Sequence, residues 1–334
     1  MRVFSVLLVL FLCLQAIGAE KFKGKYGRDY FVQLPENYDP AKKYWLFVIV
    51  HGHRGNGEKM INRINKFAFK NNVIAVAPSF PWDPKMGGYY QVLGGNSDKQ
   101  LLDIFKNLGK KHKLHDRMLI WGHSGGSQFG HRFAMVHHKY VLACAASSGG
   151  SWGTASKKAV YLPFAISCGE KDTKKSVSSS PMGRLDWYRS FRQQMIKSKM
   201  FFIGKVRPGE GHGAGPWTNT VTNELFNLAS TGMYPKQKEA FDKEIDRIEA
   251  LIKSGDTKKV PYEISRLRNF KIPKLDYKEA PVDDTDEKQK QKYKKSVNEY
   301  GFTGSSSSEK YLKERFQYYL KEIVVPKLQE LSKK

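Results

Sequence analysis

Short, unbroken runs of apolar residues recur along the first two thirds of the chain, separated by more polar stretches. Each run has the length of a strand, and none alternates between apolar and polar positions. Strands buried on both faces of a parallel sheet have this pattern. The sequence therefore predicts buried strands at residues 45–50, 73–78, 117–121, 141–147, 160–167 and 200–206, and a further strand near the start at 30–32.

Segments with helical spacing lie between these runs. At residues 98–112, apolar side chains recur at Leu101, Leu102, Ile104, Phe105 and Leu108, which places them on one face of a helix. Further helices are predicted at 58–71, from the turn at 122–126 to about residue 138, at 185–197 and at 223–229. Strands that alternate with helices predict an α/β fold, a mostly parallel sheet with helices on both faces and right-handed connections.

The last hundred residues have a different pattern. They are rich in charge, with helical stretches at 238–253 and 309–331, a segment rich in Pro and Asp at 271–287, and a flexible Gly-Ser joint at 304–308. We therefore expect an α/β domain over residues 20–234 and a helical, charge-rich C-terminal extension over 235–334.

The first nineteen residues are typical of a secretory signal peptide. A positive start is followed by an apolar run at 6–14 and by small residues at 16–19. The alternative, a buried N-terminal helix, is disfavoured because no polar face interrupts the run. A secreted or periplasmic protein is expected, with no integral membrane segment after cleavage, because no other run approaches the roughly 18 apolar residues that a spanning helix needs.

The charge of the chain is unbalanced. Its 57 Lys and Arg against 32 Asp and Glu give a net charge of +25, and residues 1–234 carry +19 of it. Charge of this size affects solubility and association with partners rather than the fold. For a secreted protein, nucleic acid is an improbable partner, whereas an anionic polysaccharide, a cell surface or an acidic substrate would fit. The slightly preferred alternative is that the positive charge has no specific partner and only keeps the protein surface solvated.

A serine stands in the turn predicted after the strand at 117–121. Residues 122–126 fit the pattern G-x-S-x-G, in which the serine lies on a strained strand-to-helix turn that exposes its hydroxyl. The flanking glycines remove side chains that would collide there. We interpret Ser124 as a nucleophile; the alternative is a glycine-rich turn without chemistry.

A serine nucleophile needs a base and an acid that orients the base. With this turn, the order along the chain is Ser, then Asp or Glu, then His. His212 lies in a glycine-rich loop just after the last predicted strand and is the expected base. Asp172, three residues beyond the strand end at Gly169, is the expected acid, with Glu170 as its rival.

Two backbone N–H groups are expected to stabilise the oxyanion that forms when the serine attacks. One belongs to Gly125, directly after the nucleophile. The other is assigned to His53, in the glycine-rich loop after the strand at 45–50, with Arg54 as the alternative.

Aromatic residues in the predicted loops are candidates for the walls of the substrate site, because their faces can stack on sugars, phenolic acids or a polyester. Core packing is the alternative for each. The candidates are Trp82, Tyr89, Tyr90, Trp152 and Trp217.

Neither a metal site nor a cofactor is expected. Asp283, Asp284 and Asp286 could hold calcium, but a solvated acidic turn is the preferred interpretation. Cys144 and Cys168 lie in apolar runs, so two buried free thiols are preferred over the disulfide that secretion would permit.

Several of these segments together resemble a known family. The segment 34–40, the His-Gly pair at 51–52, the serine turn at 122–126, Gly169 with Asp172, and Gly211 with His212 are similar to secreted α/β-hydrolases of the feruloyl esterase and polyhydroxyalkanoate depolymerase type. The resemblance covers about residues 25–232. It departs at His53 and Arg54, where relatives often have small residues or cysteine, which leaves the acyl and alcohol preference open.

The resemblance implies the α/β-hydrolase fold and a serine esterase without cofactor. Its substrates would be carboxylic esters, either acyl groups linked to a polysaccharide or a polyester, cleaved through an acyl-enzyme intermediate. Two alternatives remain: a serine peptidase of the same fold, and a non-catalytic carbohydrate- or surface-binding protein on a hydrolase scaffold. The sequence does not indicate an oligomeric state.

Overall fold

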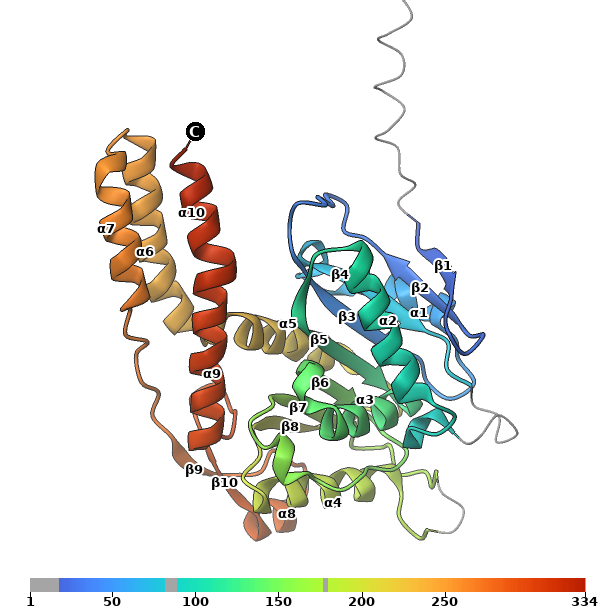
Figure 1. The fold of residues 1–334 in the computed structure, drawn as a ribbon. Coiled ribbons are helices and arrows are strands. Elements are labelled where there is room, and N and C mark those ends of the chain that lie inside the picture. Colours follow the sequence, from blue (N-terminus) through green and yellow to red (C-terminus); the bar gives the residue numbers. More distant parts are fainter. Residues whose placement is uncertain (1–17, 82–88, 177–179, 334) are drawn as a thin grey trace, which may run out of the picture.

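The computed structural model describes residues 18–81, 89–176 and 180–333 (Figure 1). Almost all of the predicted signal peptide lies outside these ranges, and so does Trp82. Within them, no helix combines the length and the apolar character that crossing a membrane requires.

An eight-stranded sheet forms the centre of the molecule, in the order β1-β2-β4-β3-β5-β6-β7-β8. Six neighbouring strands, β4, β3, β5, β6, β7 and β8, run parallel to one another. Strands β1 and β2 add an antiparallel edge beside β4. The strands are β1 (Glu20–Lys23), β2 (Asp29–Gln33), β3 (Tyr44–Val50), β4 (Val73–Pro78), β5 (Leu114–His123), β6 (Val141–Ser147), β7 (Phe164–Gly169) and β8 (Phe202–Arg207). The prediction of a mostly parallel sheet is confirmed, although β5 is longer than expected and β7 starts later.

Helices cover both faces of this sheet, as predicted. One face packs against α2 (Ser97–Lys111), α3 (Gly125–Val136) and α4 (Arg184–Lys197), and the other against α1 (Gly57–Ile61) and α5 (Gly215–Thr231). The helix expected at 58–71 is instead the short α1 followed by a 3₁₀ turn at Asn62–Lys66, whereas α5 begins earlier than expected. Other 3₁₀ turns are Lys70–Asn72, Tyr90–Val92, His138–Tyr140, Lys157–Ala159 and Thr257–Lys259.

Both cysteines among the described residues are free and buried, as preferred from the sequence. Cys144 lies in β6 and Cys168 in β7, where apolar neighbours surround them. Burial raises the pKa of Cys168 to about 12, so its thiol stays protonated and chemically inert.

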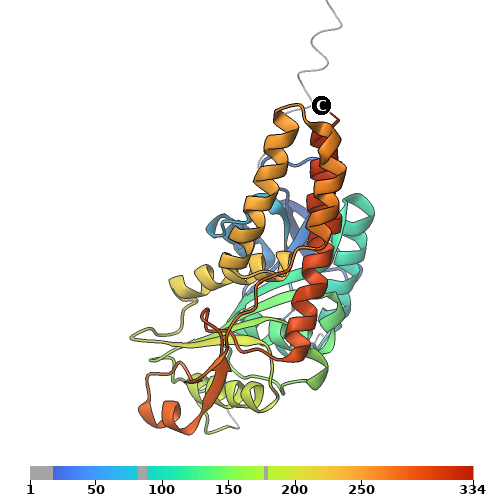
Figure 2. The ribbon, with the colours of Figure 1, turned by 90° about the vertical axis from the view of Figure 1, so that its left-hand side faces the viewer.

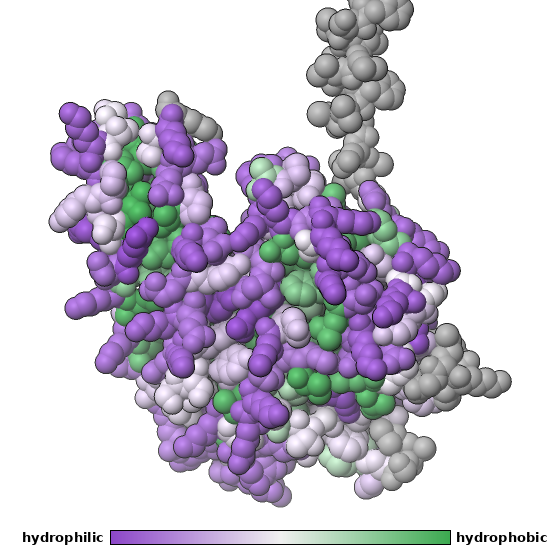
Figure 3. Space-filling view, viewed as in Figure 1, coloured by the Kyte–Doolittle hydropathy of each residue, from purple (hydrophilic) through white to green (hydrophobic). Residues whose placement is uncertain are grey.

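The C-terminal region forms a helical arm beside this body (Figures 1 and 2). It contains α6 (Pro235–Lys253), α7 (Val260–Arg268), α8 (Glu287–Lys292), α9 (Ser306–Tyr319), a π-helical stretch at Leu320–Val324 and α10 (Val325–Leu331), together with the strand pair β9 (Lys278–Pro281) and β10 (Lys294–Val297). Helices α6, α7 and α9–α10 share an apolar core of their own around Phe241, Ile248 and Phe316. Figure 3 shows an apolar strip along this arm between hydrophilic surfaces.

The arm is attached to the body at the sheet. Tyr311 of α9 donates a hydrogen bond of 2.7 Å to the carbonyl oxygen of Leu142 in β6. Arg315 pairs with Asp116 near the start of β5, at 3.0 Å. The segment before α9 lies against edge strand β8, where the N–H of Thr303 donates a hydrogen bond to the carbonyl oxygen of Phe202. Helix α9 therefore packs at the amino-terminal ends of β5 and β6.

Candidate active site

Ser124 occupies the turn between β5 and α3, at the carboxyl end of the central strand. Its φ of 56° and ψ of −119° lie in a region that residues with side chains rarely adopt. The N–H of Ser124 donates to the carbonyl of Ser147 at the end of β6, 2.9 Å away. The strain is thus held by a neighbouring strand and directs the hydroxyl out of the sheet edge.

Close backbone approaches explain the glycines around this serine. A Cβ atom on Gly122 would collide with the carbonyl of Gly126, and one on Gly126 would collide with the carbonyl of Val50 in β3. Only glycine lets β3, β5 and α3 approach each other this closely. The sequence motif therefore has a packing reason at each of these two positions.

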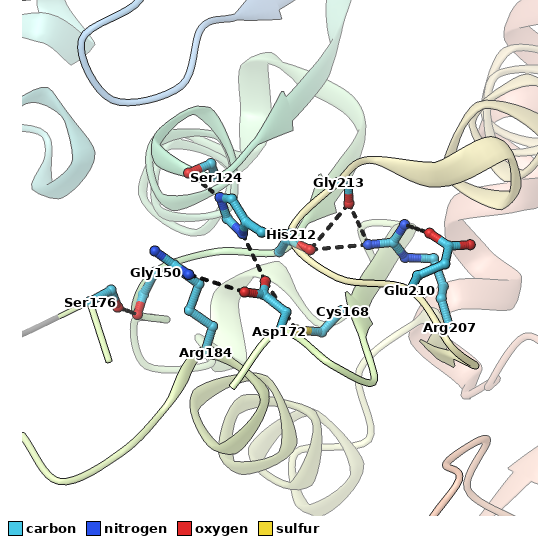
Figure 4. A network of polar contacts seen from close by, with 11 residues as sticks. Ser124, Gly150, Cys168, Asp172, Ser176, Arg184, Arg207, Glu210, His212 and Gly213 are labelled. Atoms are coloured by element: carbon cyan, nitrogen blue, oxygen red, sulfur yellow. Dashed lines mark hydrogen bonds and ion pairs between the residues drawn. The ribbon is translucent and has the colours of Figure 1, made fainter. Parts of the chain in front are cut away.

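Ser124, His212 and Asp172 are joined by two hydrogen bonds (Figure 4). The distance between His212 Nε2 and Ser124 Oγ is 3.0 Å, and that between His212 Nδ1 and Asp172 Oδ2 is 2.8 Å. The His212 side chain is 33% exposed and that of Asp172 only 1%. The three come from the loops after β5, β7 and β8, which meet at one edge of the sheet.

Asp172 is the carboxylate that meets the histidine, and Glu170 is not. The side chain of Glu170 accepts a hydrogen bond of 2.7 Å from the N–H of Gly209 instead. Burial by itself would raise the pKa of Asp172, but hydrogen bonds and charge from His212 and Arg184 outweigh burial and leave that pKa below its ordinary value. Asp172 therefore remains ionised beside the imidazole.

The backbone amide of His53 lies beside Gly125. A Cβ atom built on Gly125 would stand 2.8 Å from the nitrogen of His53 and would also collide with the hydroxyl of Tyr90. Tyr90 in turn donates to the carbonyl of His51, 2.8 Å away, which anchors this loop. The side chain of His53 turns to Gln91, with 3.0 Å between His53 Nδ1 and Gln91 Nε2.

The loop that carries His212 is held by a buried arginine that the sequence analysis did not single out. Arg207, at the end of β8, donates to the carbonyl of Gly213 and to Ser148 Oγ, the latter at 3.0 Å, and pairs with Glu210. Without such bonds a loop this rich in glycine would have many conformations. In the sequence, the available signal was an arginine that directly follows the buried Val206 at the end of a mostly apolar strand.

His123, directly before the serine, lies beside His212, with 4.9 Å between the ring centroids and the two rings tilted by 43°. Burial, and next the neighbouring His212, lower the pKa of His123 to about 3. Its ring is therefore neutral at ordinary pH and adds no charge to the site.

The aromatic candidates do not form one wall. Tyr89 is 43% exposed, whereas Tyr90 and Trp152 are buried in the core, the ring of Trp152 stacking on that of Phe191. Trp217 lies on α5, partly buried against the opposite face of the sheet. Core packing, the alternative interpretation, therefore describes Tyr90 and Trp152, because their rings fill space between helices and sheet. Trp82 lies outside the described residues.

The acidic turn at 283–286 differs from the solvated turn that was expected. Asp284 is buried, and its carboxylate accepts hydrogen bonds of 2.7 Å from both Arg189 and Arg192 of α4. The turn thus ties the C-terminal region to α4. Across the described ranges, no group of three or more His, Cys, Asp or Glu side chains is suited to hold a metal ion.

No family model and no curated protein matches the sequence. Solved structures do match the fold. Poly(aspartic acid) hydrolase-1 from Sphingomonas sp. KT-1 is 16% identical, with a TM-score of 0.52 over 63% of this chain and 98% of that chain. A poly(3-hydroxybutyrate) depolymerase from Bordetella parapertussis is 18% identical, with a TM-score of 0.50 over 65% and 91%.

A thermostable esterase is also similar, at 16% identity and a TM-score of 0.50 over 65% of this chain and 64% of that chain. Identities this low establish a shared fold. Together with the mostly parallel sheet, the helices on both its faces and the serine turn after β5, these similarities show that this chain has the α/β-hydrolase fold.

Proposed function

We propose that this protein is a secreted serine hydrolase that cleaves carboxylic esters through an acyl-enzyme intermediate. The observation that carries the proposal is the hydrogen-bonded series from Asp172 through His212 to Ser124, with the serine on its strained turn. Secretion rests on the signal-peptide pattern of the first nineteen residues.

The arrangement supports a two-step reaction. His212 Nε2 takes the proton of Ser124 as its oxygen attacks the ester carbonyl, and the carboxylate of Asp172 stabilises the imidazolium that forms. The imidazolium then protonates the departing alcohol. Next, His212 takes a proton from water as its oxygen attacks the acyl-serine. The imidazolium then returns that proton to the Ser124 oxygen as the acid departs, which restores the free enzyme.

The oxyanion of each tetrahedral intermediate would be bound by the N–H groups of Gly125 and His53. The proximity of the His53 nitrogen to Gly125 supports this assignment. Donors already in place before the reaction stabilise developing charge without reorganisation, which is commonly the largest contribution to catalysis in such sites.

The substrate class we favour is a polymer or a polymer-linked ester, an acyl group on a polysaccharide or a polyester. Two of the similar structures act on polymers by name, a poly(3-hydroxybutyrate) depolymerase and a poly(aspartic acid) hydrolase. The one-third exposure of the His212 side chain fits a site that a large substrate can reach.

Ser124→Ala tests the proposal. We expect it to lower the rate of hydrolysis of short acyl esters by at least about 10³-fold and to abolish labelling by a fluorophosphonate probe. The thermal unfolding midpoint should be unchanged. Ser127→Ala, at a buried serine three residues further along α3, is the matched control and should keep both activities.

A panel of feruloylated and acetylated glycans, polyesters and peptide amides would then separate the alternatives. Cleavage of amides but not esters would favour a peptidase. Absence of labelling and of hydrolysis in the wild-type protein would favour a binding protein.

A further inference from the structure

Besides His212, the buried carboxylate of Asp172 has a second partner, a permanently charged arginine, which proton transfer between Ser124 and His212 does not itself require. Its Oδ2 faces His212, and its Oδ1 accepts a hydrogen bond of 3.1 Å from Nη1 of Arg184. Figure 4 shows the carboxylate of Asp172 between the histidine ring and the guanidinium group. The Arg184 side chain is 19% exposed, so this charge is largely removed from water.

The backbone holds Arg184 in this place. Arg184 is the first residue of α4, and the N–H of Leu185 donates to the carbonyl of Asp172 over 3.0 Å. A β-bridge joins Lys175 to Gly183, where any Cβ atom would collide with the carbonyl of Thr173. The loop that carries Asp172 and the start of α4 are thus joined by backbone hydrogen bonds, which fix where the Arg184 side chain begins.

We propose that Arg184 is a positioning residue: it fixes the carboxylate of Asp172 toward His212 and lowers the pH at which the site becomes active. This inference rests on the proposed serine hydrolase function. A permanent cation beside the carboxylate offsets part of the negative charge that the imidazole ring experiences. The protonated ring is then less stabilised, and the base becomes available at lower pH.

The charge balance around Asp172 agrees with this role. Burial would raise the pKa of the carboxyl group, and His212 and Arg184 together bring it below its ordinary value. Without Arg184, the buried carboxylate would lose its direct ion pair and would keep the His212 ring and the weakly donating thiol of Cys168 as side-chain partners. Its rotamer and its ionisation would both be less secure.

Two titratable groups that face the site contribute no charge at ordinary pH. His123, from β5, is kept neutral chiefly by burial, which with its neighbours lowers its pKa to about 3. Cys168, from β7, lies 3.8 Å from Asp172 Oδ2 and stays a thiol, because burial raises its pKa to about 12.

Other charged groups near the site have hydrogen-bond or ring partners other than the Asp172 carboxylate, although the charge of Arg207 also acts on Asp172. Arg207 of β8 binds Glu210 and the carbonyl of Gly213. Asp186 of α4 caps the N–H of Gly183, and Arg63 lies over the Trp121 ring, 4.3 Å from its centroid. Among the described residues, Arg184 is therefore the arginine that hydrogen-bonds directly to the acid.

The experiment compares pH–rate profiles of ester hydrolysis for the wild-type protein, Arg184→Gln and Arg184→Lys. For Arg184→Gln we expect kcat to fall about tenfold and the acid limb of the profile to move up by about one pH unit, because the uncompensated carboxylate keeps the imidazole protonated to higher pH. Arg184→Lys retains the charge but not the planar fork, so its acid limb should stay near the wild-type position while kcat still falls.

Arg189→Gln is the matched control. Arg189 lies on the same helix, has the same 19% side-chain exposure and pairs with a buried aspartate, Asp284, away from the triad. We expect it to lower the thermal unfolding midpoint and leave the acid limb unmoved. An unmoved limb in Arg184→Gln, with only a lower midpoint, would reduce Arg184 to a structural ion pair and overturn the proposal. If Arg184→Gln does not fold, a shifted limb in Arg184→Lys would overturn it.

A second readout separates this inference from the proposed function. The ring of His212 is titrated by NMR in the wild-type protein and in Arg184→Gln, without substrate. An upward shift of the titration midpoint in a protein that hydrolyses no ester would reject the esterase and retain the role of Arg184. Ester hydrolysis that depends on Ser124, with no shift in either readout, would reject the role of Arg184 alone.

Discussion

Ser124 stores backbone strain at the point where chemistry is proposed. A non-glycine residue with φ of 56° and ψ of −119° costs on the order of 1–3 kcal/mol, which its surroundings must offset. The hydrogen bond to Ser147 and the close contacts of Gly122 and Gly126 supply that support. The strain keeps the hydroxyl within hydrogen-bond distance of His212.

Also at the scale of single residues, substituting the two neighbouring carboxylates Asp172 and Glu170 should have very different effects on kcat. Asp172→Asn should lower kcat by about 10⁴-fold, the loss seen where an amide leaves the histidine in the wrong tautomer. Glu170→Gln should cost less than about tenfold, because Glu170 bonds to Gly209 and Thr285 rather than to His212. Steady-state kinetics on a short acyl ester would measure both, and the reverse order would transfer the role to Glu170.

At the scale of secondary-structure elements, the site depends on how closely β3, β5 and α3 approach. Gly126 of α3 lies against the carbonyl of Val50, the last residue of β3, and the loop after β3 carries His53. The same close approach therefore positions the proposed nucleophile, Ser124, and the proposed oxyanion donor, His53. The extension protects another element, since Thr303 and Asp283 bond to the backbone of edge strand β8 and cover a strand that would otherwise be exposed.

Gly126→Ala tests that dependence. The added methyl group would force α3 away from β3, so we expect a loss of stability of about 1–3 kcal/mol and a large loss of ester hydrolysis. Gly109→Ala is the control, because Gly109 lies within α2 and a Cβ atom there meets nothing within 4 Å. It should raise stability by about 0.5–1 kcal/mol with unchanged activity. Chemical denaturation would measure both, and equal stability of the two variants would contradict the packing explanation.

At the scale of the whole molecule, the arm and the site are attached to opposite ends of the same strand. Arg315 of α9 pairs with Asp116 near the start of β5, whereas Ser124 follows its end. Tyr311 of α9 likewise reaches Leu142, the second residue of β6. Helix α9 thus stabilises the sheet at a distance from the chemistry.

Tyr311→Phe separates stability from activity. Removing the buried hydroxyl deletes the hydrogen bond to Leu142, so we expect a loss of stability of about 1 kcal/mol. Activity on a short ester below the unfolding transition should be unchanged. Tyr262→Phe, at an exposed tyrosine of α7, is the control and should alter neither property. A selective loss of activity in Tyr311→Phe would show that α9 acts on the site.

The excess of +19 over residues 1–234 leads to a prediction about salt. If part of this charge surrounds the site, the rate at low concentration of an anionic polymer substrate should fall between about 0.02 and about 0.5 M salt, because screening shortens the reach of exposed charges. A neutral small ester should show no such fall. An equal salt response for both substrates would mean that the charge serves solvation only.

A pair of variants locates that effect. Lys174→Glu changes an exposed charge on the loop just after Asp172, and Lys110→Glu makes the same change near the end of α2, before β5 begins. We expect only the first to weaken the salt dependence for the anionic substrate. The same weakening in both variants would indicate a diffuse field of the whole molecule.

The local pattern of the chain determined the alternation of strands and helices, the serine turn and the order of serine, acid and histidine. These features depend on residues close together in sequence: apolar runs form buried strands, and glycines permit the tight turn. Asp172 was separable from Glu170 by its distance from the strand end alone. The parallel sheet then brings these loops together at one edge, where the structure places the three side chains within hydrogen-bond distance.

Tertiary packing decided what no local pattern specifies. Arg184, at the start of α4, holds Asp172, and Arg207, at the end of β8, holds the loop of His212; both contacts depend on how α4 and β8 pack. Tyr90 is buried in the core although it lies between the predicted strands and helices. The attachment of the arm through Tyr311 was equally invisible, since its partner Leu142 is 169 residues away. A side chain's periodicity indicates which face is buried, but contacts between distant segments follow only from the packing of the whole chain.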